Sequence, residues 1–125
     1  MQIVPVPNVR ALNTTPLARV CLDSSTVRVE LDDASETRFE LRFSPYQALR
    51  AVTADCFLAP DGYTVDPTAV VEIVGSPWIQ ELRAKLAVVD EDAHFLDEAR
   101  HFLVPLQDDF LEVVALSIES ETLST

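Results

Sequence analysis

Glycine and cysteine are both scarce in this chain, and each shortage excludes a class of site. Its 125 residues include two glycines, Gly62 and Gly75, which belong to no glycine-rich loop of the kind that wraps a nucleotide phosphate. The two cysteines, Cys21 and Cys56, form no closely spaced pair such as a disulfide framework or a zinc site needs. We therefore expect two free thiols, each acting as a small buried hydrophobic residue.

Long apolar runs are absent as well. No run reaches the roughly 18 residues of a membrane helix, and no basic leader followed by an apolar run stands at the start of the sequence. The expectation is a cytoplasmic protein without a membrane partner. The length predicts a single domain over 1–125, in which 1–16 is an extended arm and 119–125 is a frayed tail.

Basic residues are few after residue 50. Residues 1–50 hold six arginines and six acids, which sum to zero, whereas residues 51–125 hold three basic residues and fifteen acids. The second part therefore carries the whole net charge of −12. Such a field repels phosphate backbones and excludes nucleic acid as a partner. It can steer a basic protein into an encounter, although net charge also simply keeps proteins soluble.

What the chain does contain is a strong β pattern near its C-terminus. Two apolar runs, 102–106 and 110–118, flank three polar residues and predict a hairpin. The second run has only Glu112 as a charge, which is typical of a central strand. Because an isolated buried carboxylate is costly, Glu112 must reach solvent or pair with a base such as an arginine. Pro105 cannot donate a ladder hydrogen bond, so the first strand is an edge or a bulge there.

A second hairpin is predicted from alternating apolar and polar residues at 26–31 and 37–43. Pairing Val29 with Phe39 places the apolar residues on one face and opposite charges across the other face. Pattern and charge therefore favour that register.

The segment 45–56 fits two structures. A Ser-Pro pair at its start and the apolar spacing that follows favour a helix slightly. The residues 48–53 would also suit a strand, so both alternatives stay open. Further strands are predicted at 17–22 and 70–74.

The clearest helix is predicted at 77–89. Ser76 can cap it, Pro77 suits its first turn, and Leu82 and Leu86 recur on one face. Two hairpins alone would expose their apolar faces, so we expect this helix to cover the sheet. The predicted fold class is therefore α+β, with an antiparallel sheet of two or more hairpins packed by one main helix.

Residues suited to catalysis or metal binding are few. His94 and His101 lie seven residues apart, whereas zinc ligands on one helix are spaced by about three to five. We expect His101 to be a partly buried strand residue and Trp78 to be a packing residue rather than a ligand platform. The sequence predicts no catalytic residue, no metal ligand and no cofactor.

Three motifs carry a resemblance: Ser76-Pro77-Trp78, the run from His101 to Val104, and the run from Asp109 to Ala115. On these motifs the chain resembles small uncharacterised bacterial proteins, some of which are similar to immunity proteins of polymorphic toxin systems. The resemblance implies a compact α+β protein that binds and masks a toxin, and it transfers no catalytic residue. Pro105 departs from the pattern of the first hairpin strand.

Three function classes follow from these observations. The first is a non-catalytic protein of immunity type that masks a basic protein partner through an acidic surface. The alternatives are a structural or homo-oligomeric domain and a small-ligand binder or enzyme, and a pocket that holds polar groups with shifted pKa values would favour the latter. The predicted partner-binding residues are Asp90, Glu91, Asp92, Asp97, Glu98, Asp108 and Asp109.

Neutralising the hairpin tip tests the first class. If its acids steer association, replacing Asp108 and Asp109 together with asparagine should slow the association rate of the basic partner and flatten its salt dependence. The dissociation rate and the fold should change little. Surface plasmon resonance at several salt concentrations measures both rates, and a double variant that behaves like wild type at every salt concentration would contradict the steering role.

Overall fold

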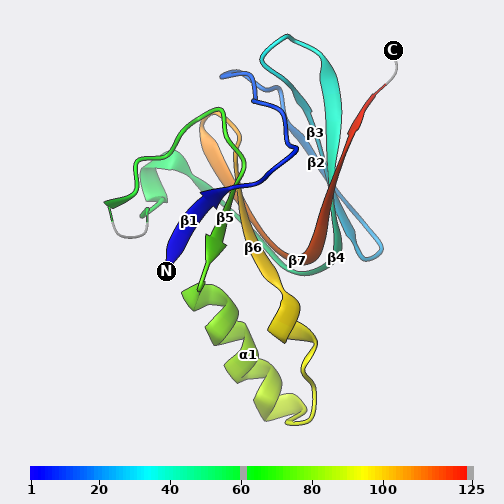
Figure 1. Ribbon diagram of the computed structural model, residues 1–125, viewed down its shortest axis with the longest axis vertical. Helices are drawn as coiled ribbons and strands as arrows, with labels where there is room; N and C mark the ends of the chain where they lie inside the picture. Colours follow the sequence, from blue (N-terminus) through cyan, green and yellow to red (C-terminus); the bar gives the residue numbers. More distant parts are fainter. Residues whose placement is uncertain (60–61, 124–125) are drawn as a thin grey trace.

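The computed structural model describes residues 1–59 and 62–123, and within these ranges it contains a seven-stranded antiparallel sheet and one α-helix (Figure 1). The strand order across the sheet is β1-β5-β6-β7-β4-β3-β2. This arrangement confirms the predicted α+β class, with strands as its larger part. The elements are β1 (Gln2–Pro5), β2 (Arg19–Asp23), β3 (Thr26–Asp32), β4 (Arg38–Thr53), η1 (Ala54–Cys56), β5 (Val71–Val74), α1 (Pro77–Val89), η3 (Phe95–Glu98), β6 (Arg100–Pro105) and β7 (Asp109–Thr122).

Both predicted hairpins are present, as β3–β4 and β6–β7. The strand β7 lies between β6 and β4, which confirms its central place. On its other side β6 pairs with β5 only between His101 and Leu103, so Pro105 lies beyond that ladder and needs no amide donor there. The strands expected at 17–22 and 70–74 appear as β2 and β5.

The segment 45–56 is mainly a strand, and the slight preference for a helix was wrong. β4 continues through Thr53, and Ala48 to Thr53 pair residue by residue with β7. The irregular Ser-Pro pair is absorbed by a register shift between Tyr46 and Ala48. The long edge of β7 offers a full ladder of hydrogen bonds, which outweighs the local preference for a helix.

The tail also differs from the prediction. β7 extends through Thr122, which pairs with Phe39 of β4, so residues 119–122 are part of the sheet rather than frayed. Glu119 and Glu121 reach Arg42 of β4, which explains how a polar sequence is held in a strand. Residues 124–125 lie outside the described part of the chain.

The register of β3 and β4 is shifted by two residues from the predicted one. Val29 pairs with Leu41, not with Phe39, and Phe39 pairs with Leu31. The shift keeps every side chain on its predicted face, because the side-chain period of a strand is two. Its cause is the turn: the Asp33 carboxylate accepts the amide hydrogens of Ser35 and Thr37, each at 2.9 Å, and so closes a short loop.

This register places like charges opposite each other in β3 and β4. Arg28 faces Arg42 and Glu30 faces Glu40 across the pair. The strands on either side of this pair offset the repulsion between the two arginines, because Arg42 donates to Glu121 of β7 at 2.6 Å and Arg28 lies 3.4 Å from Asp23 of β2. Charge matching within one hairpin was therefore a misleading guide to its register.

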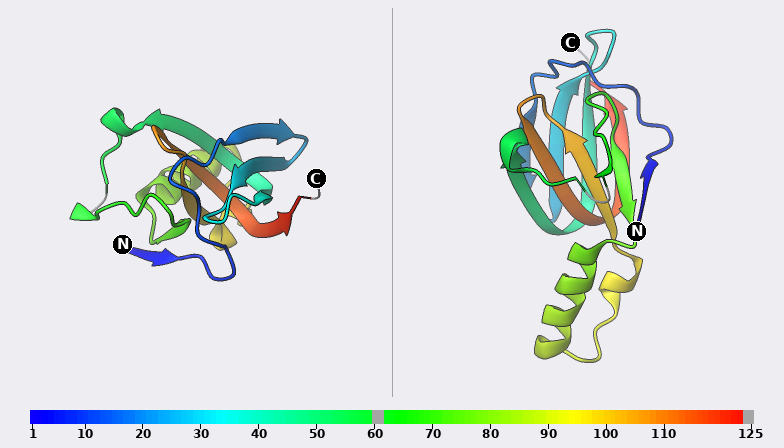
Figure 2. Two further views of the ribbon diagram at one scale, coloured as in Figure 1. Left: turned by 90° about the horizontal axis from the view of Figure 1, so that it is seen from above. Right: turned by 90° about the vertical axis from the view of Figure 1, so that its left-hand side faces the viewer.

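Helix α1 has the predicted bounds but does not cover the sheet. Figure 2 shows it extending away from one end of the sheet, next to η3. Only Ile79 of the helix is buried, and Leu82 and Leu86 are half-buried. The prediction that α1 acts as a lid was wrong because the sheet buries its apolar face by curving on itself (Figure 2). The core is formed by Val6, Leu12, Val27, Val29, Leu31, Phe39, Leu41, Phe43, Val70, Phe102, Val104, Leu111, Val113 and Ala115.

The N-terminal arm closes the open side of this core. Its Val6 and Leu12 are 6% and 1% exposed, and the backbone between them follows the 68–70 segment. The amide of Leu12 donates to the carbonyl of Thr68 at 2.8 Å, and the next amide, that of Asn13, donates to Asp32 of β3 at 3.0 Å. The arm therefore joins the β5 side of the sheet to the β3 side, which no element of the predicted fold did.

Both cysteines are exposed, contrary to the expectation that they are buried. Cys21 lies on the edge strand β2, all of whose residues are exposed, and Cys56 lies in η1. An apolar residue on an edge strand has no neighbouring strand to cover it, and the sequence pattern did not reveal which strands are edges.

Two matched substitutions test which element closes the core. Leu12→Ala should lower the free energy of unfolding by about 2–5 kcal/mol, because it leaves a cavity beneath the arm. Leu86→Ala on α1 should cost about 1 kcal/mol or less, because its side chain is only half-buried. Urea denaturation measures both changes. Similar losses for the two variants would show that α1 contributes to the core as much as the arm does.

Candidate functional site

Four polar side chains form a continuous hydrogen-bonded chain on the face of the sheet opposite the main core. Ser76 Oγ lies 2.7 Å from Nδ1 of His101, and Nε2 of the same ring lies 2.8 Å from Oε1 of Glu112. Arg50 completes the chain by donating from Nε to Oε2 of Glu112 at 2.7 Å and from an Nη to Oε1 at 3.1 Å. This double contact is the planar arrangement in which guanidinium and carboxylate bind most strongly.

The strand pairing explains why these residues meet. Arg50 of β4 lies directly opposite Glu112 of β7, and His101 of β6 lies diagonally across from Glu112 on the same face. Ser76 is the N-cap of α1, where its Oγ accepts the amide hydrogen of Ile79 at 3.2 Å. Three strands and one helix start therefore supply one group each.

Burial makes the arrangement rigid. Ser76, His101 and Glu112 are each 3% exposed, and among the described residues every buried side-chain nitrogen or oxygen has a hydrogen-bond partner. A neutral ring that carries its proton on Nε2 satisfies the whole chain, since the Ser76 hydroxyl then donates to Nδ1 and Nε2 donates to Glu112. The expectation that Glu112 pairs with an arginine is confirmed.

Two opposing effects set the pKa of Glu112. Burial by itself raises the pKa of this carboxyl, because it penalises the charged form. The hydrogen bonds that His101 and Arg50 donate, together with the positive charge of Arg50, act in the other direction and prevail, so the pKa falls from 4.5 to about 2. Glu112 is therefore ionised at neutral pH and keeps Arg50 in place.

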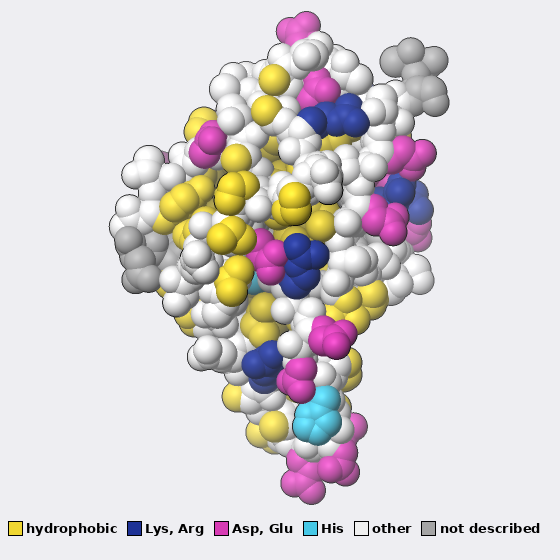
Figure 3. Space-filling view, in the orientation of Figure 1, with side chains coloured by type: hydrophobic (Ala, Val, Ile, Leu, Met, Phe, Trp, Pro, Cys, Tyr) yellow, Lys and Arg dark blue, Asp and Glu magenta, His cyan; other side chains and the backbone are white. Residues whose placement is uncertain are grey.

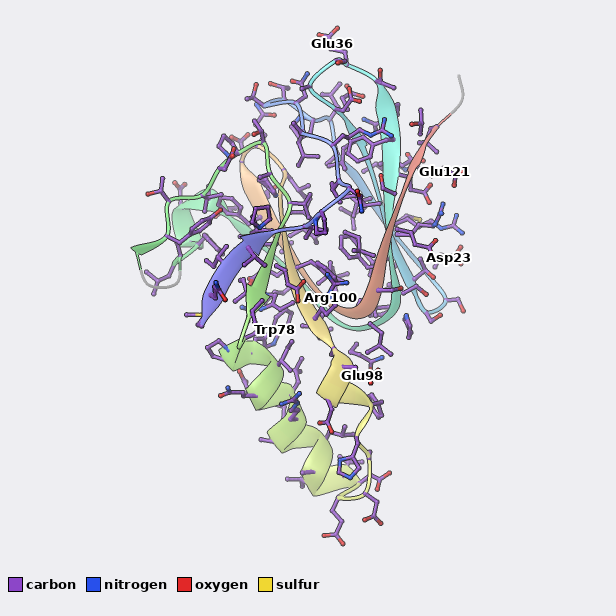
Figure 4. The ribbon with its side chains drawn as sticks, viewed as in Figure 1. Asp23, Glu36, Trp78, Glu98, Arg100 and Glu121 are labelled. Atoms are coloured by element: carbon purple, nitrogen blue, oxygen red, sulfur yellow. The ribbon has the colours of Figure 1, made fainter. Side chains whose placement is uncertain are left out.

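A pocket of about 370 Å³ opens beside this chain. Its wall includes Trp78, whose ring lies 3.9 Å beneath the guanidinium carbon of Arg50 and makes an edge contact with His101 at 5.2 Å. Figure 4 places Trp78 where the first turn of α1 meets the end of β5. Trp78 therefore packs against its neighbours, as expected, and also forms part of the pocket wall. The lining residues are Met1, Arg50, Val52, Cys56, Phe57, Leu58, Ile73, Pro77, Trp78, His101 and Glu112.

The order serine, histidine, carboxylate is also that of a charge relay, but the serine here is badly placed to attack a substrate. Ser76 Oγ is buried and its lone pair accepts the helix-capping amide of Ile79. Ser76 lines a neighbouring pocket of about 230 Å³ and not the pocket that contains Arg50 and Trp78. A nucleophile must be accessible and free to react, so we interpret Ser76 as the anchor of the chain.

Residues 1–59 and 62–123 contain no group of three or more His, Cys, Asp or Glu side chains that could hold a metal ion. None of the helices in these ranges is long and apolar enough to cross a membrane.

The seven predicted partner-binding acids fall into two groups at opposite ends of the molecule (Figure 1). Asp90, Glu91 and Asp92 follow the free end of α1, where Figure 3 shows acidic side chains at the tip of the molecule. Asp97 and Glu98 lie in η3, which packs beside the helix, and Figure 4 places Glu98 near the start of β6. The remaining two, Asp108 and Asp109, lie at the β6–β7 turn. All seven are exposed, but the structure does not join them into one surface.

Sequence reasoning found Glu112 but missed the site around it. The missing step was the structure of 45–56: only as a strand does this segment bring Arg50 opposite Glu112. The only signal for it was that residues 48–53 would also suit a strand. His101 and Ser76 carried no comparable signal, because a histidine in a strand and a serine at a helix start each have an ordinary structural explanation.

Comparison of the chain with protein-family models, curated proteins and solved structures gave no match. The resemblance to immunity proteins therefore stays a prediction.

The pKa of Glu112 predicts how its contribution to stability varies with pH. A depressed pKa stabilises the folded protein above pH 4.5, and this stabilisation, up to about 3 kcal/mol, is lost as the pH falls toward 2. Glu112→Gln should therefore be less stable than wild type at pH 6, and the difference should shrink between pH 4.5 and 2. Urea denaturation across this range measures it.

The exposed variant Glu91→Gln serves as the control and should match wild type throughout the same range. A difference between Glu112→Gln and wild type that is independent of pH would mean that packing, rather than the charge of Glu112, explains the loss.

Proposed function

We propose that this protein binds a small amphipathic molecule, with an apolar or aromatic body and one hydrogen-bond acceptor, in the pocket beside Arg50. The observation that carries the proposal is the position of Arg50, which is paired with Glu112 and whose guanidinium carbon lies 3.9 Å from the centre of the Trp78 ring, in the lining of a pocket of about 370 Å³. Apolar walls with a few oriented polar groups are typical of small-molecule sites of this size.

The hydrogen-bond donors of Arg50 that remain free determine which chemical group of the ligand can bind there. Its Nε and one Nη are used by Glu112, whereas the other Nη makes no hydrogen bond to a described residue. The Arg50 side chain is 46% exposed, so this nitrogen can reach a ligand. Guanidinium groups donate well to carbonyl, carboxylate and sulfonate oxygens. The ligand should therefore present such an oxygen to Arg50.

Glu112 limits the net charge that the site tolerates. Both of its oxygens are engaged, so it offers no free acceptor to a cationic ligand. It also neutralises Arg50, and the remaining field of the protein is acidic, with a net charge of −12. A neutral or singly anionic molecule suits these conditions better than a phosphate-rich one.

Rigidity favours binding over chemistry. The side chains around Glu112 are fixed before a ligand arrives, so little conformational entropy is lost when it binds. The buried Ser76 supplies no accessible nucleophile, and we assign no catalytic role to any residue of the site.

Two fluorescent probes test this proposal. Anilinonaphthalene sulfonate has an aromatic body and a sulfonate, and N-phenylnaphthylamine has a similar body without the charge. Both should bind the native protein saturably and quench Trp78, the only tryptophan. Val52→Phe narrows the pocket and should weaken both probes at least about tenfold, a loss of roughly 1.4 kcal/mol. Arg50→Lys should weaken the sulfonate probe more than the neutral one.

Val88→Phe is the matched control, because Val88 is 88% exposed on α1 and far from the pocket lining. It should bind both probes like wild type. Equal affinities of Val52→Phe and Val88→Phe, or binding that leaves Trp78 emission unchanged, would place the probes elsewhere and contradict the pocket as the binding site.

A second candidate is the predicted non-catalytic function in the cytoplasm, in which the protein masks a basic protein partner. The observation that favours it is the free end of α1, where Asp90, Glu91 and Asp92 follow the exposed side chains of Val88 and Val89. Beside the helix, η3 adds the exposed residues Phe95, Asp97 and Glu98. Protruding acids beside apolar side chains suit recognition of a protein with basic and apolar residues. Here the steering role belongs to Asp90, Glu91 and Asp92 rather than to the distant hairpin tip. Neutralising Asp90, Glu91 and Asp92 in one variant, and Asp108 and Asp109 in another, shows which group of acids sets the association rate of the basic partner.

A further inference from the structure

The strand β2 is an exposed edge with an unusual sequence. It ends the sheet, pairs only with β3, and all five of its residues are exposed. Among the described residues, no backbone hydrogen bond outside the β2–β3 ladder involves Arg19 to Asp23. Val20 and Leu22 are 41% and 54% exposed although they stand on the same face as the fully buried Val29 and Val27. Such an edge is a template for another strand.

The sequence of β2, Arg19-Val20-Cys21-Leu22-Asp23, complements itself when it is reversed. In an antiparallel pair centred on Cys21, Arg19 faces Asp23 of the second strand at both ends, and Val20 faces Leu22. The two charged residues of β2 therefore each face a residue of opposite charge. The exposed apolar residues Val20 and Leu22 cover Leu22 and Val20 of the second copy. Moving the centre to Val20 or Leu22 leaves Arg19 or Asp23 opposite an uncharged residue.

The hydrogen-bonding directions agree with the same centre. β2 and β3 are joined by a two-residue turn between Asp23 and Thr26, and Ser24 has a positive φ of 55°. Residues that flank such a turn bond to each other, and bonding then alternates along the ladder. Val20 and Leu22 thus direct their backbone groups to the free edge, where they can bond to Leu22 and Val20 of another strand.

We propose that two copies of this chain associate through β2, with a twofold axis at Cys21, and join their sheets into one. Electrostatic repulsion between two copies is small at this edge, because the charges of residues 1–50 sum to zero although the whole chain carries −12. The interface extends the apolar face that Val27 and Val29 begin, and adds an Arg19–Asp23 ion pair on each side of the axis. A five-residue edge buries less than a standard interface, so the dimer is weak and depends on concentration.

The axis places the two Cys21 residues directly opposite each other in a pair that does not exchange backbone hydrogen bonds. The Cα atoms of such a pair are about 4.5 Å apart, which is within the range that a disulfide spans. Cross-linking therefore reports this register. Diamide is a suitable oxidant, because two thiols form one disulfide by giving two electrons and two protons to one diamide, which becomes a hydrazine.

The experiment compares two proteins that each keep one exposed thiol. Cys56→Ser leaves Cys21, and Cys21→Ser leaves Cys56 as a control for random collision. On non-reducing gels, the protein with Cys21 should form the covalent dimer at least about tenfold faster. In the Cys56→Ser background, Val20→Lys should remove this advantage, because it sets a charge against each Leu22, whereas Val88→Lys on α1 should not.

Reversing the charges provides a stricter test. Arg19→Asp alone should slow cross-linking, and the double variant Arg19→Asp with Asp23→Arg should restore it, because the ends become complementary again. Circular dichroism confirms that each variant is folded. Sedimentation equilibrium of the wild type under reducing conditions should show dimers that increase with concentration. The proposal is overturned by a monomer at every concentration, by equal cross-linking of Cys21 and Cys56, or by a loss with Val88→Lys instead of Val20→Lys.

Discussion

The antiparallel pairing of β4 with β7 is the constraint on which the rest of the structure depends. These two strands are the longest in the sheet, with 16 and 14 residues, and they pair from Phe39 with Thr122 to Thr53 with Asp109. One half of the ladder supplies Phe39, Leu41 and Phe43 to the core. The other half places Arg50 opposite Glu112. A single pairing therefore positions both the hydrophobic core and the candidate site.

The site gains its order from a balance between burial and pairing. A carboxylate as buried as Glu112 is costly by itself, and removing one partner of a buried ion pair is generally more damaging than replacing the whole pair with apolar residues. Here the carboxylate has both a guanidinium and an imidazole as partners, and the imidazole is anchored by a serine that also caps α1. Hydrogen bonds thus connect the start of the helix and three strands to the carboxylate of Glu112. This connection explains how an otherwise loosely packed helix keeps its position relative to the sheet.

The N-terminal arm covers the core, which the helix was expected to do, and the helix stays mostly exposed. The helix has an apolar stripe and good capping residues, but most of its surface stays exposed, including Val88 and Val89. The arm has no regular period, yet Leu12 is among the most buried residues. A curved sheet needs only a narrow cover along its open side, and an extended segment can follow that line while its amides bond to both sides.

The sequence by itself determined the α+β class, the bounds of α1, most strand positions, the central place of β7, the interruption of the ladder at Pro105, as an edge or a bulge, and the requirement that Glu112 reach solvent or pair with a base. These features depend on residues close together in the chain, where period, capping and proline act directly. Only the tertiary structure decided the strand at 44–53, the β3–β4 register, the exposure of the cysteines and the meeting of Arg50, Ser76 and His101 at Glu112. Arg50 and Glu112 are separated by 62 positions, so their contact follows from which strand edges pair, and local patterns do not specify that choice.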